Sequence, residues 1–189
     1  IDLRLTLLAL TFVIAFALAV TFPFQLAWKT RQHLDTTIIF SAVLIFEPGI
    51  AITVVAVGGV VAQMIRRTSW AHISFNVAQM TLQAVGASLV LAWSGWDPNA
   101  PQFNRPATLL AIFIAGAAIF VINTSTVAIV IGLERGESPL RIWLHSTAIL
   151  DRVEALLHLG QIGIALLAAV IADAHVWALG LLLLPVAAM

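Results

Sequence analysis

The sequence predicts an all-α, polytopic membrane protein: a single domain, residues 1–189, built as a bundle of six transmembrane helices. Hydrophobic residues make up 61% of the 189 residues and charged residues only 10%, which leaves too little polar surface for a soluble fold of this size. The apolar residues come in long runs and not in alternation, which predicts spanning helices and argues against a β-barrel. All six tryptophans lie at or just outside the ends of these runs, as expected of side chains that prefer the membrane interface.

The spans follow from the apolar runs taken in order along the chain. They cover about 5–27, 37–65, 73–93, 107–133, 155–172 and 176–189. The first run exceeds the core of a signal peptide and no small-residue cleavage pattern follows it, so we expect it to be retained. Residues 94–106 carry one glycine and three prolines and must form a loop. Pro139 is well placed to begin an amphipathic surface helix, which leads into the fifth span.

The second span is unusual because it contains a break. From Thr36 to Ile65 the chain runs for thirty residues with Glu47 as its only formal charge. Pro48 and Gly49 follow directly and cannot simply continue a helix, which predicts either one kinked span or two pieces. A single kinked helix would put Glu47 near the midplane, whereas a short re-entrant or surface helix over 37–46 would put it near the outer face. The sequence leaves both arrangements open.

The basic residues predict the orientation in the membrane. With the amino terminus in the cytoplasm, the inner side holds six of them and the outer side three. The inner six are Arg4, Arg66, Arg67, Arg135, Arg141 and Arg152, and the outer three are Lys29, Arg31 and Arg105. This distribution favours a protein with both termini in the cytoplasm.

Polar side chains inside the spans form stripes that predict a shared polar centre. In the third span, Asn76, Gln79 and Gln83 share one helical face, which must meet protein or a cavity because lipid offers amides no partner. Asn123 and Thr126 share a face of the fourth span, and a stripe that includes His158 and Gln161 runs into the fifth. An acid in an apolar run is also a functional candidate. The candidate ligand-binding residues are therefore Glu47, Asn76, Gln79, Gln83, Asn123, Thr126, His158 and Gln161.

Each stripe also has a purely structural interpretation. Amides often hold transmembrane helices together, and hydroxyls can bond back to their own helix. The stripe of Asp151, Glu154 and His158 can face lipid headgroups, and Glu47 can simply cap a helix. Glu154 and His158 have ligand-like spacing, but one such pair does not predict a metal site. Catalytic motifs are missing from the sequence, so we expect neither an enzyme nor a cofactor, and a net charge of zero gives no indication of nucleic-acid binding.

Two segments resemble a known family. FEPGIAITVVAVGGVVAQMIRRTSWAHISFNVAQMTLQAVGASLV and VINTSTVAIVIGLERGESPLRIW are similar to the multi-span sensor regions that precede GGDEF and HD-GYP domains in bacterial cyclic di-GMP signalling proteins. The residues that carry the resemblance are Pro48, Gly49, Phe75, Asn76, Ala78, Gln79 and Asn123, and it covers about residues 40–143. No GGDEF or HD-GYP sequence is present in this chain, so the resemblance implies the membrane input part alone or a stand-alone relative.

Three functions are therefore compatible with the sequence. The resemblance favours a sensory input domain that binds a small molecule, lipid or partner and signals to a cytoplasmic output domain, attached or separate. A looser likeness in architecture to the substrate-binding subunits of vitamin uptake transporters suggests transport instead. A structural subunit of a homo-oligomer or larger membrane complex is the third, and all three require the lipid bilayer as a partner.

Overall fold

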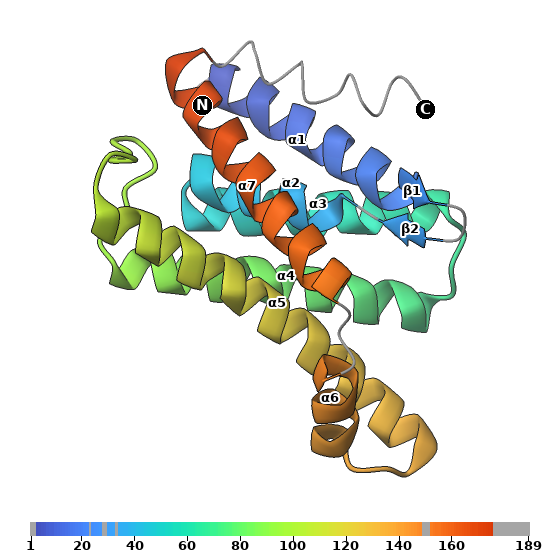
Figure 1. The fold of residues 1–189 in the computed structure, drawn as a ribbon. Helices are drawn as coiled ribbons and strands as arrows, with labels where there is room; N and C mark the ends of the chain where they lie inside the picture. The colour runs from blue at the N-terminus through green and yellow to red at the C-terminus, as the bar shows by residue number, and fades with distance from the viewer. Residues whose placement is uncertain (1–2, 23, 28–29, 33, 149–151, 176–189) are drawn as a thin grey trace.

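The fold is a bundle of helices with one short hairpin of strands. The computed structural model describes residues 3–22, 24–27, 30–32, 34–148 and 152–175 (Figure 1). In chain order the elements are α1 (Leu3–Thr21), β1 (Phe24–Ala27), β2 (Thr30–Gln32), α2 (Asp35–Ile45), α3 (Pro48–Ile65), α4 (Trp70–Trp93), α5 (Pro106–Arg135), α6 (Pro139–Ala148) and α7 (Arg152–Ala174). Strands β1 and β2 pair antiparallel, with an irregularity between Gln25 and Ala27.

Five of the described helices are long and apolar enough to cross a membrane. They are α1, α3, α4, α5 and the 156–174 part of α7. This result agrees with the predicted class, a helical membrane protein, and with the predicted spans near 73–93, 107–133 and 155–172. The predicted first span, 5–27, was too long: α1 ends at Thr21, and residues 24–27 form strand β1, which pairs with β2. The predicted sixth span, 176–189, lies outside the described residues.

The helix boundaries follow local chemistry. Pro48 and Pro106 open α3 and α5, because a proline at the first helical position loses no hydrogen bond. Gly136 ends α5 in the left-handed conformation, with a φ of 66°, which glycine adopts without steric cost. Ser69 precedes α4 in an extended conformation, and its hydroxyl lies 2.6 Å from Nδ1 of His72 in the first turn.

The predicted second span, 37–65, consists of two helices that run in opposite directions. Helix α2 ends beside the last turns of α4, where Phe46, Leu91 and Trp96 line one small cavity. Helix α3 then returns along α1 and leads through the turn at residues 66–69 into α4. The break at Glu47 and Pro48 is therefore a reversal of direction and not a kink in one crossing.

Helix α2 occupies the centre of the bundle. It contacts α1, α3, α4 and α7, and every residue from Ile39 to Leu44 is at most 3% exposed. Its 11 residues make it about 16 Å long, roughly half of the ~30 Å hydrocarbon thickness of a bilayer. A helix that is apolar on all sides is stable only where other protein covers it. The bundle supplies this cover through α7, whose buried face consists of Ile162, Ala165, Ala168, Ala169 and Ala172.

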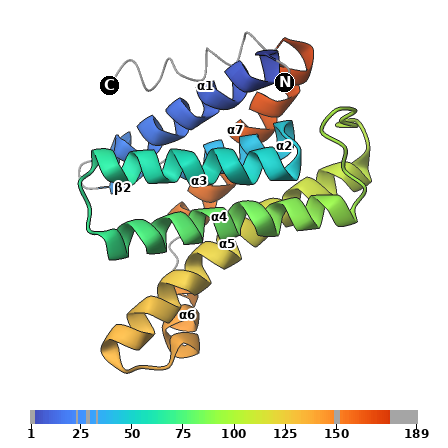
Figure 2. The ribbon, with the colours of Figure 1, turned by 180° about the vertical axis from the view of Figure 1, so that it is seen from behind.

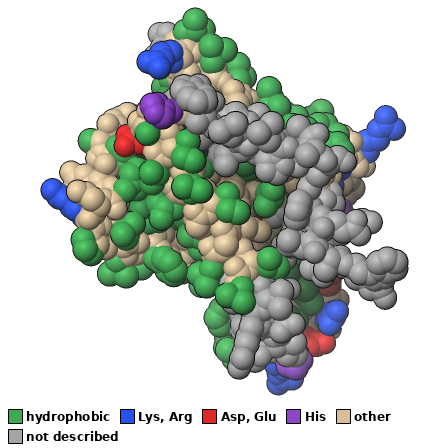
Figure 3. Space-filling view, turned by 45° about the horizontal axis from the view of Figure 1, so that its top comes forward, with side chains coloured by type: hydrophobic (Ala, Val, Ile, Leu, Met, Phe, Trp, Pro, Cys, Tyr) green, Lys and Arg blue, Asp and Glu red, His purple; other side chains and the backbone are tan. Residues whose placement is uncertain are grey.

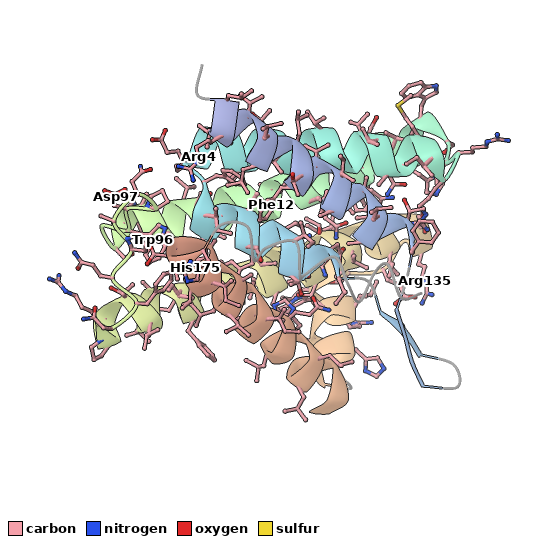
Figure 4. The ribbon with its side chains drawn as sticks, turned by 90° about the horizontal axis from the view of Figure 1, so that it is seen from above. Arg4, Phe12, Trp96, Asp97, Arg135 and His175 are labelled. Atoms are coloured by element: carbon pink, nitrogen blue, oxygen red, sulfur yellow. The ribbon has the colours of Figure 1, made fainter. Side chains whose placement is uncertain are left out.

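The contacts between α1 and α3 define the two ends of the molecule. The Phe12 ring packs on Phe46 with a centroid distance of 5.1 Å, and Phe16 packs on Gly58, so α1 and α3 run in the same direction. As a result, the β1–β2 hairpin, the 66–69 turn and the α5–α6 turn share one end, which we name the hairpin end (Figures 1 and 2). The start of α1, the reversal at Glu47, the 94–105 loop and the end of α7 share the other, the loop end. Figure 4 shows Arg4, Asp97 and His175 on one side and Arg135 on the other.

This arrangement differs from the sequence-based expectation in one respect. The sequence count placed Arg66 and Arg67 on the same side as Arg4, because it treated 37–65 as one crossing. Helix α2 adds a return across the bundle, which brings the 66–69 turn to the same end as the hairpin strand that contains Arg31. The end of α7 consequently lies near the start of α1. The sequence count had placed these two ends on opposite sides of the membrane.

The predicted amphipathic helix before the fifth span is α6, and it folds back along α5. The indole nitrogen of Trp143 donates a hydrogen bond to the Thr124 hydroxyl at 3.0 Å. Near the turn, Gly132 lies directly under Pro139, since a Cβ at Gly132 would sit 2.9 Å from the proline ring. The last half of α5 and α6 thus form a hairpin that projects from the bundle in Figure 1.

The surface has the character of a lipid-facing bundle. In Figure 3, hydrophobic side chains cover the middle of the visible face and charged side chains lie around its edge. Trp70 and Trp93, at the two ends of α4, are 74% and 92% exposed. Apolar side chains exposed over this much of a surface are stable when they contact lipid instead of water.

Candidate functional site

The amide groups of Gln79 and Asn123 join α4 to α5. Nε2 of Gln79 donates to Oδ1 of Asn123 at 2.6 Å and approaches the Asn123 carbonyl oxygen at 3.3 Å. Both side chains are half-buried. Two amides that face each other satisfy polar groups that hydrocarbon cannot, so this pair holds the two helices in one register.

The rest of the predicted stripe on α4 lies along the same contact with α5. Gln83, one turn further along, is buried with 4% exposure, and Gly86 lies against Ile122 of α5. Asn76, one turn toward the hairpin end, is half-buried. The stripe therefore runs from a partly accessible end at Asn76 to an enclosed end at Gln83.

The hydroxyls of α5 bond mainly to their own helix. Thr126 Oγ1 donates to the carbonyl oxygens of Ile122 at 2.8 Å and of Asn123 at 2.9 Å. Thr124 Oγ1 donates to the Phe120 carbonyl at 2.9 Å and accepts from Trp143. Thr126 thus contacts the amide pair only through the Asn123 carbonyl, which favours the structural interpretation of this residue.

His158 lies against another part of α5. Its Nε2 is 3.3 Å from the Gly116 carbonyl oxygen, and its ring packs on Phe120 with a centroid distance of 5.0 Å. Gly116 and Asn123 are seven residues apart on one face of α5, about 10 Å along the helix axis. His158 and the amide pair therefore contact α5 about two helical turns apart, with Phe120 between them. Gln161, one turn along α7 from His158, is half-buried there.

The start of α2 adds polar residues that the sequence analysis did not single out. Asp35 lies close enough to His158 for their charges to interact, and its carboxylate accepts a hydrogen bond from the Thr36 amide at 2.9 Å. Thr36, Thr37 and Ser41 are all buried. Ser41 bonds to the Thr37 carbonyl at 2.8 Å, whereas the Thr37 hydroxyl has no hydrogen-bond partner. The available signal was local: Asp-Thr-Thr at the edge of an apolar run has the composition of a helix start.

These groups all lie inside the bundle, away from the loop end. Measured along their helices from the loop end, Asp35, Gln79 and His158 lie about 16, 21 and 24 Å inside, at 1.5 Å per residue. The first turn of α2 also exposes backbone amides that no helical carbonyl satisfies, which adds positive potential at this level. We call Asp35, Thr37, Gln79, Asn123 and His158 the polar centre.

Glu47 lies apart from the polar centre. It is exposed at the loop end, where it precedes α3, and its carbonyl oxygen accepts from the amides of Ile50 and Ala51 at 3.0 Å. Its side chain makes no capping hydrogen bond. Among the described residues, no group of three or more His, Cys, Asp or Glu side chains is placed to hold a metal ion.

A groove between α5 and α7 reaches the polar centre from the side. It has a volume of about 210 Å³ and is lined by Phe113, Ala117, Phe120, His158, Leu159 and Ile162. Five of these six side chains are apolar, and the sixth, His158, belongs to the polar centre. The groove thus places an imidazole at the edge of an otherwise apolar surface.

We compared the chain with known proteins in three ways. No protein-family model, no curated protein sequence and no solved structure matches it.

Proposed function

We propose that this chain is a sensory input domain of a bacterial signalling protein, embedded in the inner membrane, and that it binds its ligand at the polar centre. The observation that carries the proposal is the pair formed by Gln79 and Asn123, which lies inside the bundle, as does the buried start of α2. Hydrogen-bonding groups at this depth, beside a helix that does not span the membrane, are typical of membrane proteins that bind ligands.

The chemistry of the site defines the class of ligand. Amides, a hydroxyl and an imidazole can bind a head group that both donates and accepts hydrogen bonds. The groove lined by Phe113, Phe120 and Ile162 can bind an apolar chain or ring. The proposed ligand is therefore an amphipathic small molecule or lipid that enters sideways from the bilayer.

Helix α2 is the proposed moving part. It packs on the alanine face of α7, where close backbone approach depends on shape and not on hydrogen bonds. A ligand that binds more tightly to one packing of α2 on α7 than to another would shift the population between them. Because α7 is the last described helix, a change in its packing would be transmitted to the residues that follow it in the sequence.

The resemblance to cyclic di-GMP signalling proteins supports the same proposal. Three residues that carry it, Asn76, Gln79 and Asn123, belong to the α4–α5 contact in which the amide pair lies. In this function the output domain is cytoplasmic, and it follows the input domain or associates with it.

The test is to identify the small molecules and lipids that remain bound to the protein during purification. The full chain and an Asn123→Leu variant are extracted in mild detergent, denatured, and the released small molecules and lipids are measured by mass spectrometry. We expect one amphipathic compound to be enriched with the wild-type chain and reduced at least ~10-fold by Asn123→Leu, since 1.4 kcal/mol of lost binding is tenfold in affinity. Thr126→Val is the matched control, because Thr126 bonds to its own helix.

Other outcomes separate the alternative functions. An equal set of compounds with the wild-type and variant chains would contradict binding at the polar centre and favour a structural subunit. Transport would be indicated by a compound that accumulates in cells only when the chain is expressed together with a transporter ATPase.

A further inference from the structure

The two ends of the bundle differ strongly in basic residues. At the hairpin end lie Arg31 in β2, Arg66 and Arg67 in the turn before α4, Arg135 at the end of α5 and Arg141 in α6. The loop end holds Arg4 in the first turn of α1 and Arg105 just before α5. Of these seven arginines, five lie at the hairpin end and two at the loop end, and the eighth described arginine, Arg152, begins α7. Arg66, Arg67, Arg135 and Arg141 are all exposed, and Figure 4 shows Arg4 and Arg135 on opposite sides of the molecule.

The acidic residues do not repeat this division. Glu47, Asp97 and Asp173 are exposed at the loop end, and Glu134 and Glu137 are exposed at the hairpin end. Three acids against two arginines give the loop end a net negative charge among the described residues. Five arginines against two exposed acids make the hairpin end positive, and Arg152 and Glu154 in the first turn of α7 cancel each other.

We infer that the hairpin end faces the cytoplasm and the anionic headgroups of the inner leaflet, so that the loop end faces the outside. Short loops rich in Lys and Arg are retained in the cytoplasm during membrane insertion, whereas acidic residues contribute little to the choice. The anionic surface of the inner leaflet attracts the same residues. The connections at the hairpin end are only a few residues long, which is the condition under which this rule operates.

This orientation differs from the one obtained by counting charges along the sequence at the start of α1 and at the β1–β2 hairpin, and it agrees with that count from residue 66 onward. That count divided the basic residues six to three, because it treated 37–65 as one crossing and so assigned the 66–69 turn to the side of Arg4. The reversal between α2 and α3 moves Arg66 and Arg67 to the end that contains Arg31. The same rule applied to the observed arrangement therefore exchanges the sides of Arg4 and Arg31, and it keeps Arg66, Arg67, Arg135 and Arg141 in the cytoplasm.

One consequence rests on the proposed function. The run 176–189 lies outside the described residues, and its sequence predicts a further span. Since α7 ends at the loop end, such a span would begin outside and lead back into the cytoplasm. The inferred orientation thus delivers the chain to the compartment in which a signalling output domain works, whereas the opposite orientation would deliver it outside.

The chain contains no cysteine, which makes single-cysteine labelling a direct test. The variants are Ser69→Cys and Glu137→Cys at the hairpin end, and Asn99→Cys and Gln102→Cys at the loop end; all four positions are exposed. Each variant of the 189-residue chain is expressed in bacteria, and the cells are converted to spheroplasts. The spheroplasts are treated with a membrane-impermeant maleimide before and after permeabilisation. Total thiol is measured after denaturation, so a variant that is absent from the membrane is recognised.

We expect the two loop-end cysteines to be labelled in intact spheroplasts at least tenfold more than the two hairpin-end cysteines. The hairpin-end cysteines should react only after permeabilisation. The reverse pattern, or equal labelling of both ends, would overturn the inference. Replacing both Arg66 and Arg67 by Glu should increase labelling of Glu137→Cys in intact cells, whereas Arg4→Glu should not.

This readout does not depend on any ligand. If the orientation is confirmed while no compound is released from the purified protein, the proposed function fails and the inference stands. If a compound is released and the labelling is reversed, the inference fails alone.

Discussion

At the scale of single residues, polar groups in this bundle are placed where another helix can satisfy them. Gln79 meets Asn123, Trp143 meets Thr124, and His158 meets the Gly116 carbonyl oxygen. Hydroxyls that face no such partner, like that of Thr126, bond to their own backbone. The hydroxyls of Thr37, Thr81 and Ser88 are exceptions, since each is buried without a hydrogen-bond partner, and that of Thr37 lies at the start of α2. An unsatisfied donor in a membrane interior is costly, which makes this position a natural contact for a polar ligand.

The Gln79–Asn123 pair predicts a measurable coupling. We expect Gln79→Leu and Asn123→Leu each to destabilise the fold, because each leaves one amide without its partner. A double-mutant cycle should then give an interaction free energy of about 1 kcal/mol, as found for hydrogen bonds between transmembrane helices. The measurement is unfolding in mixed detergent micelles, followed by circular dichroism. Additive effects of the two substitutions would contradict the bond.

Two glycines of α3, Gly58 and Gly49, should differ in how strongly replacement by alanine lowers the stability of the fold. A Cβ at Gly58 would lie 2.8 Å from Cδ1 of Phe16 and 3.2 Å from the Val13 carbonyl oxygen, so Gly58→Ala must push α1 away from α3. We expect a loss of about 1–3 kcal/mol in the free energy of unfolding, typical of overpacked cores. Gly49→Ala, in the same helix with nothing within 4 Å, is the control and should be neutral or slightly stabilising. Equal effects at both positions would show that α1 and α3 do not approach closely.

At the scale of elements, α2 and α7 form the least ordinary contact of the fold. Lipid chains are as apolar as leucine, so two helices in a membrane gain little from apolarity alone and associate through close packing. Ala165, Ala168, Ala169 and Ala172 present small side chains to the bundle interior, and α2 lies against this helix. The contact between α2 and α7 therefore depends on the small volume of the alanine side chains.

A larger side chain on the buried face of α7 should consequently weaken the packing of α2. Ala168 is fully buried, so Ala168→Leu should cost about 1–3 kcal/mol in the free energy of unfolding and should loosen α2. Faster hydrogen exchange confined to residues 35–45, measured by mass spectrometry, would report this loosening. Ala174→Leu, at an exposed position of the same helix, is the matched control. Unchanged exchange in α2 with Ala168→Leu would contradict the packing.

At the scale of the whole molecule, α4 gives the height of the bundle in the membrane. It has 24 residues and is therefore about 36 Å long, slightly more than the ~30 Å hydrocarbon core. Trp70 and Trp93 mark its two ends and are largely exposed. Tryptophan prefers the headgroup region, so these two side chains should anchor the molecule at opposite interfaces.

The two anchors predict a depth measurement. In vesicles with brominated lipids, variants that keep only Trp70 or only Trp93, with phenylalanine at the other five positions, should both be quenched most strongly by shallow labels. The expected distance from the bilayer centre is about 15–18 Å for each, half the length of α4. A deep position for either one would contradict a transmembrane α4.

Much of the fold was predictable because the apolar runs are a local property of the chain. Three spans, the 94–106 loop and the helix that begins at Pro139 agree with α4, α5, α7 and α6. The first span agrees with α1 only as far as Thr21, because the β1–β2 hairpin that follows depends on pairing between two segments. The candidate site was predictable in part, since amide spacing on α4 indicates a stripe and Gln79 meets Asn123. Asp35 and Thr37 were missed because their partner, α7, is more than one hundred residues away in the sequence.

The sequence by itself determined the class of protein, the extent of α4 and α5 and the break at Pro48, since each depends on the composition of a short segment. The tertiary structure alone decided that α2 turns back, that α1 and α3 run in parallel and that the two ends of the bundle carry unequal charge. Residues 38–46 are almost uniformly apolar, so their sequence pattern predicts neither which face of the helix is buried nor in which direction the helix runs. Only the shape of the surrounding helices, which presents small side chains on α7 and Phe12 and Phe16 on α1, determines which way it runs.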